Sequence, residues 1–240
     1  MSQRITDVDE LLGRETMMAV HLLGTGLTSI RKYNFTSKGS FYSGMFSVTI
    51  GLERILKLIL LLNYKINNNC YPDDDFLRRK GHKIKALIKD CKEINDNLID
   101  TKLKNSQETF DDLLVRKIVN FLTQFSTDTR YYNLNVVTGE STNLNEPLAH
   151  WDNEICLIIL NRHPPSKKKI EEYKNSAMAL EPYSIVHHTH ENGSHIGDVN
   201  SLFHQSSFIE EKQGYSVYYI YKIVSFAIEL LVELDFKMNP

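Results

Sequence analysis

The sequence predicts an all-α fold, a multi-helix bundle, on three observations. Apolar residues recur at steps of three and four along most of the 240-residue chain, which is the period of a helix that covers a core. No regular alternation of strand-like and helical segments, as a parallel sheet requires, is found. Hydrophobic residues make up 42% and charged residues 24% of the chain, which is typical of a globular protein with a sizeable core.

Four helices are expected in the first half of the chain, over about 13–33, 40–64, 82–98 and 107–125. The second of them carries Glu53 and Lys57 at i, i+4, a spacing that favours an ion pair. Lysines lie opposite the apolar stripe of the third. The polar run before that helix ends in three aspartates, Asp73 to Asp75, which we expect to break the helical pattern and to cap the next helix.

The second half begins with a stretch, about 126–145, that is predicted to be an ordered loop, with a short strand over 131–137 as the alternative. Helices are expected over about 147–162 and 166–182, and a long one over 214–236. The segment 186–198 is polar and rich in histidine and is expected to be a loop. The chain is therefore predicted to form a single all-α domain, 1–240, in which 126–145 is the only plausible seam.

The charge balance and the cysteine count restrict the class of protein. With 28 basic and 30 acidic residues, the net charge of −2 gives no chain-wide attraction for nucleic acid, so any such contact must be local. Three widely spaced cysteines support neither a disulfide framework nor a cysteine-based zinc motif. The N-terminus lacks the apolar stretch of a signal peptide, and the most apolar segments are too short or too amphipathic to span a membrane. A cytoplasmic protein without membrane contact is expected.

Two neighbouring motifs suggest a family. A long helix carries Gly51, Glu53 and Lys57, and the next helix is introduced by Gly81 and His82. This pattern resembles the HEPN superfamily (higher eukaryotes and prokaryotes nucleotide-binding), with Lys83 where the family usually has an acid. The resemblance covers about 13–125 as a HEPN-like core, is followed by a similar segment to about 135, and leaves 146–240 as an added helical half.

The resemblance implies a helical bundle, often a homodimer, with a role in toxin–antitoxin, phage-defence or related systems. Many members of the superfamily are metal-independent endoribonucleases whose motif is an arginine, four to six residues, and a histidine. In that chemistry the histidine moves a proton and the arginine holds the phosphate. The spacing occurs here only as Arg14 and His21, far from the end of the bundle where catalytic members generally carry it.

Other residues are therefore the candidates for catalysis and for binding of RNA or a nucleotide. The catalytic candidates are His82, Arg79, Arg130, His190 and His195, and the binding candidates are Arg78, Lys83, Tyr131, Tyr132, Glu53 and Lys57. Arginine and lysine attract phosphate, and tyrosines beside an arginine stack bases. Each group also fits a purely structural role, as an ion pair, a solvated charged face or an aromatic contact that docks a loop.

The histidine-rich segment adds a further alternative, because imidazoles close together bind transition metals. Its spacing matches no known metal motif, so no metal ligand is assigned and no cofactor is expected. The leading hypothesis is a HEPN-like protein that binds or cleaves RNA or a nucleotide, with a homodimer or a partner protein such as an antitoxin. A non-catalytic helical interaction module and a metalloprotein remain the alternatives.

Overall fold

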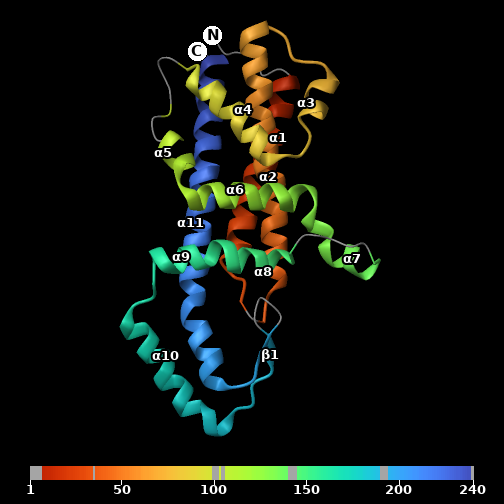
Figure 1. Ribbon diagram of the computed structural model, residues 1–240. Coiled ribbons are helices and arrows are strands. Elements are labelled where there is room, and N and C mark those ends of the chain that lie inside the picture. Colours follow the sequence, from red (N-terminus) through yellow and green to blue (C-terminus); the bar gives the residue numbers. More distant parts are fainter. Residues whose placement is uncertain are drawn as a thin grey trace.

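Three long helices run side by side through the centre of the all-α bundle (Figure 1). They are α1 (Asp7–Ile30), α2 (Gly39–Asn68) and α11 (Val199–Met238). The helices α1 and α2 are antiparallel and pack along most of their lengths, and α11 contacts both. The computed structural model describes residues 7–34, 36–98, 103, 106–139, 145–189 and 194–238.

Close approach of α1 and α2 depends on glycine at the position that opens the family-like motif. A Cβ atom added at Gly51 would lie 2.8 Å from the carbonyl oxygen of Ala19 and 2.9 Å from the Leu23 side chain. Backbone cannot move away from such a contact as a flexible side chain can, so any larger residue would separate the two helices. Gly51 therefore has a packing role in this fold.

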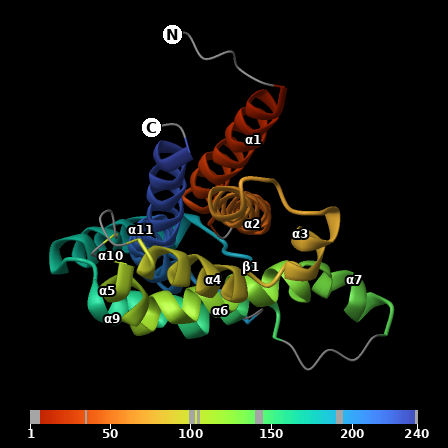
Figure 2. The same ribbon diagram turned by 90° about the horizontal axis from the view of Figure 1, so that it is seen from above.

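A second layer of shorter helices crosses one side of the central helices, as the view from above shows (Figure 2). It contains α4 (Ile84–Asp96), α5 (Ser106–Asp111) and α6 (Leu113–Thr127). Below them runs a broken helix that consists of α8 (Pro147–Trp151), the π-helix η2 (Asp152–Cys156) and α9 (Leu157–Arg162). One cluster of buried apolar side chains joins both layers, and Trp151 and Phe121 pack edge to face within it.

The remaining elements lie at the ends of the bundle. The short helix α3 (Asp74–Lys80) precedes α4, and α10 (Lys167–Leu180) packs against the first part of α11. Strands β1 (His188–Thr189) and β2 (His195–Ile196) form an antiparallel pair near the start of α2. Among the described residues, no helix combines the length and the apolar character that crossing a membrane requires.

The predicted all-α fold is confirmed, and several predicted helix boundaries have visible causes. Ser166 caps α10 by accepting the Lys169 N–H at 3.2 Å. Asp73 accepts the Phe76 N–H at 2.9 Å and so caps α3, a short helix that was not predicted, rather than the expected helix that starts near His82. The helix expected over 107–125 is split into α5 and α6, because Asp112 adopts an extended conformation and caps a new helix.

The prediction of a loop or strand after residue 126 is wrong for its described part. Helix α6 continues to Thr127, and the 3-10 turn η1 (Thr129–Tyr131) and helix α7 (Tyr132–Val137) follow it. The hydroxyls of Ser126 and Thr127 both donate to the Thr123 carbonyl, so residues that often form turns here extend a helix. Residues 140–144 of the predicted loop lie outside the described part of the chain.

The last helix begins at Val199 rather than near residue 214. Its first half lacks a clear apolar stripe and is held by polar contacts with distant segments. Lys212 pairs with Asp152, and the Gln213 side chain donates to the Tyr33 carbonyl. Such contacts depend on the complete fold, so helical periodicity could not have indicated them. In the predicted histidine loop, the structure adds the short β1–β2 pair.

Candidate functional site

Glu53, Lys57 and His82 meet at the surface of α2. The Lys57 ammonium donates to Glu53 Oε1 at 2.8 Å, and His82 Nδ1 lies 2.9 Å from the same oxygen. The Glu53 and Lys57 side chains are 16% and 20% exposed, whereas that of His82 is 64% exposed. The carboxylate is thus partly shielded and fixed, while the imidazole that it holds remains open to a ligand.

The backbone before His82 places the imidazole over Glu53. Gly81 ends α3 with φ 62° and ψ −150°, a conformation that is essentially restricted to glycine. The Ser126 hydroxyl then donates to the His82 carbonyl oxygen at 2.9 Å, and the Lys85 N–H donates to Thr123 Oγ1 at 2.9 Å. The end of α6 therefore anchors the backbone of this turn.

The two arginines of α3 already have acidic neighbours. Arg78 pairs with Asp74 at 2.8 Å, and Arg79 lies 3.6 Å from Asp73. All four side chains are at least 66% exposed, so these pairs are weak and readily exchanged for solvent. Within the described part of the chain, the ion-pair partners of both arginines are aspartates, and the carboxylate beside His82 is that of Glu53.

Arg130 and Tyr131 line a separate pocket of about 510 Å³ beside the first half of α2. The Arg130 guanidinium lies over the Tyr131 ring at 5.0 Å, and no ion pair of Arg130 occurs among the described residues. Phe46 and Phe125 form an aromatic wall of this pocket, and Ser43 and Ser47 contribute hydroxyl groups to its lining. Tyr132 begins α7 and is half-buried but does not line the pocket.

The Arg130 pocket adjoins the His82 turn through the end of α6. Phe125 belongs to the pocket wall, and the next residue, Ser126, holds the His82 backbone. On α2, Phe46 of the pocket and Glu53 are seven residues apart, so they lie on the same face of the helix, about 10 Å apart along its axis. A ligand of nucleotide size could therefore reach both features.

The histidine segment lies at the N-terminal end of α2, away from Glu53. The Lys38 ammonium, next to the first residue of α2, donates to the Thr189 carbonyl at 3.0 Å and so attaches the β1–β2 pair there. Lys38 and Glu53 are about 22 Å apart along the helix axis. His195 therefore does not lie beside His82 of the same chain. The ring centroids of His195 and His187 lie 5.0 Å apart. His190 lies outside the described residues.

A metal site in this segment receives no support from the described residues, among which no group of three or more His, Cys, Asp or Glu side chains is placed to hold a metal ion. His188 lies on the β1 strand and His195 on β2, and both rings are on a small exposed hairpin. Because His190 and Glu191 lie outside the described part, this finding concerns the remaining residues only.

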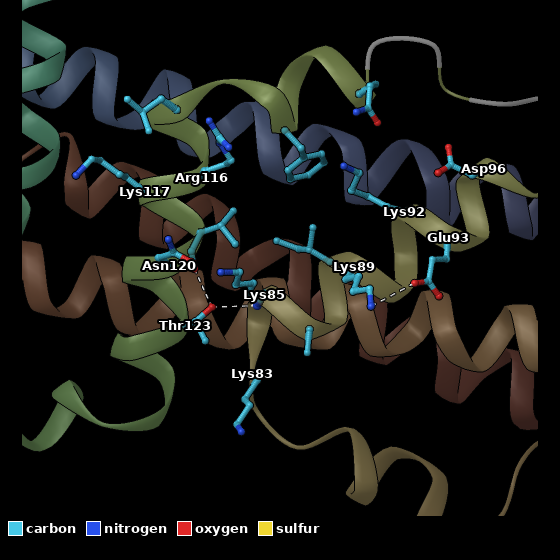
Figure 3. A pocket seen from close by; sticks show the side chains of 16 residues that line it. Lys83, Lys85, Lys89, Lys92, Glu93, Asp96, Arg116, Lys117, Asn120 and Thr123 are labelled. Atoms are coloured by element: carbon cyan, nitrogen blue, oxygen red, sulfur yellow. Dashed lines mark hydrogen bonds and ion pairs between the residues drawn. The ribbon is translucent and has the colours of Figure 1, made fainter.

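A long groove runs between α4 and α6, and the sequence indicated only one of its sides. The groove has a volume of about 860 Å³ (Figure 3). Lysines at helical spacing on α4 face Arg116, Asn120 and Thr123 of α6 across it. The lysine face of α4 was visible in the sequence, but α6 supplies the opposite side, and only the packing of the two helices in the fold brings them together. Its basic side chains are Lys83, Lys85, Lys89, Lys92, Arg116 and Lys117.

Comparison of the chain with protein-family models, with curated proteins and with solved structures gives no match. The functional assignment therefore depends on the geometry of the chain itself. Of the candidates from the sequence, Glu53, Lys57 and His82 form one cluster, and Arg130 and Tyr131 form a pocket next to it.

Proposed function

We propose that this protein binds RNA across the Glu53–Lys57–His82 cluster and the adjoining Arg130 pocket, and cleaves it without a metal ion. The observation that carries the proposal is the 2.9 Å contact between His82 Nδ1 and Glu53 Oε1. This contact lies beside an open aromatic pocket that contains Arg130, which forms no ion pair among the described residues. We further propose that the chain is HEPN-like and acts in bacterial defence or in a toxin–antitoxin pair.

The role of Glu53 in this proposal is to position His82. A carboxylate accepts hydrogen bonds, so the neutral imidazole that faces it carries its proton on Nδ1. The lone pair of Nε2 is then directed away from Glu53 and is available as a general base. Lys57 neutralises part of the carboxylate charge and fixes its orientation, because both partners bind the same oxygen.

The Arg130 pocket supplies the contacts that RNA requires. The guanidinium of Arg130 provides a charge for one phosphate, and Tyr131 and Phe46 provide rings on which a base stacks. Lys83 begins α4 beside His82 and offers a second charge. Arg78 and Arg79 have their own aspartates, so we assign the phosphate contact to Arg130.

The proposed reaction is an internal transfer within the RNA chain. His82 Nε2 takes the proton of a ribose 2′-hydroxyl, and the resulting 2′-oxygen forms a bond to the adjacent phosphorus. The bond from phosphorus to the 5′-oxygen of the next nucleotide breaks, and this oxygen takes a proton from water. The products are a 2′,3′-cyclic phosphate and a 5′-hydroxyl, and Arg130 stabilises the charge on the phosphoryl oxygens.

The test is incubation of the full-length protein with transfer and messenger RNA in EDTA. His82→Ala should slow cleavage by about 10²- to 10⁴-fold, as expected for loss of a general base, and Arg130→Ala should weaken RNA binding. His21→Ala, on the exposed side of α1, is the matched control and should retain full activity. Cleavage that is unaffected by His82→Ala would exclude this histidine from the mechanism.

A further inference from the structure

We propose that the groove between α4 and α6 is a docking site for an acidic, amphipathic helix of a partner protein. This surface is separate from the proposed RNA site, which it meets only at Lys83. The proposal combines three features of the groove: an apolar floor, basic rims on both sides and the absence of a free aromatic face.

The floor of the groove is apolar. Ile88 of α4, Val119 of α6 and Phe110 of α5 lie at its base and are almost completely buried. Leu113 and Ala86 are more exposed, and the Leu113 side chain is 50% exposed at one end of the groove. Two helices with such a floor between them form the surface on which an amphipathic helix places its apolar face.

The rims of the groove select a negatively charged partner. Six basic side chains line it against two acidic ones, Glu93 and Asp96. Glu93 lies 3.7 Å from Lys89, and Lys117 pairs with Glu154 outside the groove. The other four cations of the groove form no ion pair among the described residues; they are Lys83, Lys85, Lys92 and Arg116. Of these, Lys85 lies on the α4 rim and Arg116 on the α6 rim. Acidic residues on both flanks of an apolar helix face would complement this charge.

The single aromatic ring favours a peptide over single-stranded RNA. Non-specific binding of a single strand uses exposed rings on which bases stack. Phe110 is only 7% exposed, the Lys92 ammonium lies 5.2 Å from the centre of its ring, and the Phe226 ring packs against it at an interplanar angle of 84°. No face of this ring is left for a base, whereas aliphatic side chains such as leucine fit the floor beside it.

The length of the groove sets the size of the partner segment. Lys85 and Asp96, near its two ends, are about 16 Å apart along α4. A helix of about 11 residues covers this distance, so three turns with apolar residues at i, i+3 or i+4, and i+7 fill the groove.

The experiment uses a designed helical peptide of about 14 residues, with leucines on one face and glutamates on both flanks, labelled with fluorescein. Binding to the full-length protein is measured by fluorescence anisotropy, beside a scrambled peptide of the same composition and a single-stranded RNA of similar length. The protein variants are the double substitution Lys85→Glu with Arg116→Glu, and Leu113→Asp. Lys168→Glu, on exposed α10, is the matched control, and circular dichroism verifies that each variant is folded.

The amphipathic peptide should bind saturably, and the scrambled one at least about tenfold more weakly. Both groove variants should reduce affinity by about tenfold or more, whereas Lys168→Glu should not change it. Absence of saturable binding up to about 1 mM, or equal binding of the scrambled peptide, would overturn the proposal. So would an RNA that displaces the peptide and loses affinity with both groove variants. RNA cleavage that depends on His82 is measured separately, so either proposal can fail alone.

Discussion

The imidazole of His82 is held 2.9 Å from the carboxylate of Glu53, although the two residues are 29 positions apart in the chain. If Glu53 acts only through His82, its loss should matter only while His82 is present. Glu53→Gln should therefore reduce RNA cleavage, by less than His82→Ala does, and the double variant should match His82→Ala. Single-turnover rates in EDTA provide the measurement. Additive losses in the double variant would show that Glu53 acts independently of His82.

Gly81 should be required for activity through its backbone conformation. Alanine at φ 62° and ψ −150° is strained by about 1–3 kcal/mol, so Gly81→Ala should shift the turn that carries His82 and lower RNA cleavage. Gly13→Ala is the control, because nothing surrounds this glycine inside α1 and alanine favours a helix. Urea unfolding should show a loss of stability for Gly81→Ala and a small gain for Gly13→Ala. Full activity of Gly81→Ala would argue against the assigned role of this turn.

Gly51 should be sensitive to the smallest enlargement. Its added methyl group would meet the Ala19 carbonyl oxygen at 2.8 Å, so Gly51→Ala should destabilise the fold by about 1–3 kcal/mol. Gly24→Ala, which meets no atom within 4 Å in the same helix pair, should be neutral or stabilising. Denaturant unfolding compares the two. Equal free energies of unfolding for the two variants would mean that α1 and α2 can move apart at Gly51 without loss of stability.

The acid side of the stability profile should depend on Asp112. Burial raises the pKa of this carboxyl, but the Leu114 N–H and the Arg162 guanidinium, both hydrogen-bonded to it, outweigh burial and lower the pKa below its ordinary value. A lowered pKa contributes stability above the ordinary value of about 3.9, and this contribution is lost as pH falls through the pKa of the folded state.

Asp112→Asn should therefore lower stability at pH 7 and flatten its fall below about pH 4, while keeping the helix cap. Asp112→Ala should cost about 1 kcal/mol more, because the cap of α6 is lost as well. Urea unfolding at both pH values measures these differences. An unchanged acid profile in Asp112→Asn would remove this carboxylate as a source of acid sensitivity.

Prediction from the sequence was most accurate for the helices whose positions are determined by local interactions. Apolar periodicity indicated α2 and α4, and the helix expected from residue 166 starts at Lys167 behind its cap, Ser166. Asp73 caps α3, a helix that was not predicted. The first half of α11 was missed, because Lys212 and Gln213 are held by Asp152 and by the Tyr33 carbonyl from distant parts of the chain. No local pattern contains such contacts.

The candidate site likewise combines local features, which the sequence indicated, with contacts between distant segments, which it did not. The i, i+4 spacing predicted the Glu53–Lys57 pair, and Gly81 and His82 were expected to introduce the next helix, but the positive φ of Gly81 is known only from the structure. That His82 reaches Glu53 depends on the path of α3, which spacing does not describe. The groove between α4 and α6 needed Arg116 to face Lys85, a relationship between two helices that only their packing defines.

The most direct test of the central claim is cleavage, in EDTA, of one RNA oligonucleotide in two forms that differ by a single 2′-deoxy substitution at the cleaved position. We expect a 2′,3′-cyclic phosphate product from the all-RNA form, no cleavage at the deoxy position, and loss of cleavage, and with it of the cyclic product, in a folded His82→Ala variant. Cleavage of the deoxy form, a requirement for a metal ion, or no cleavage of RNA by the full-length protein would contradict it.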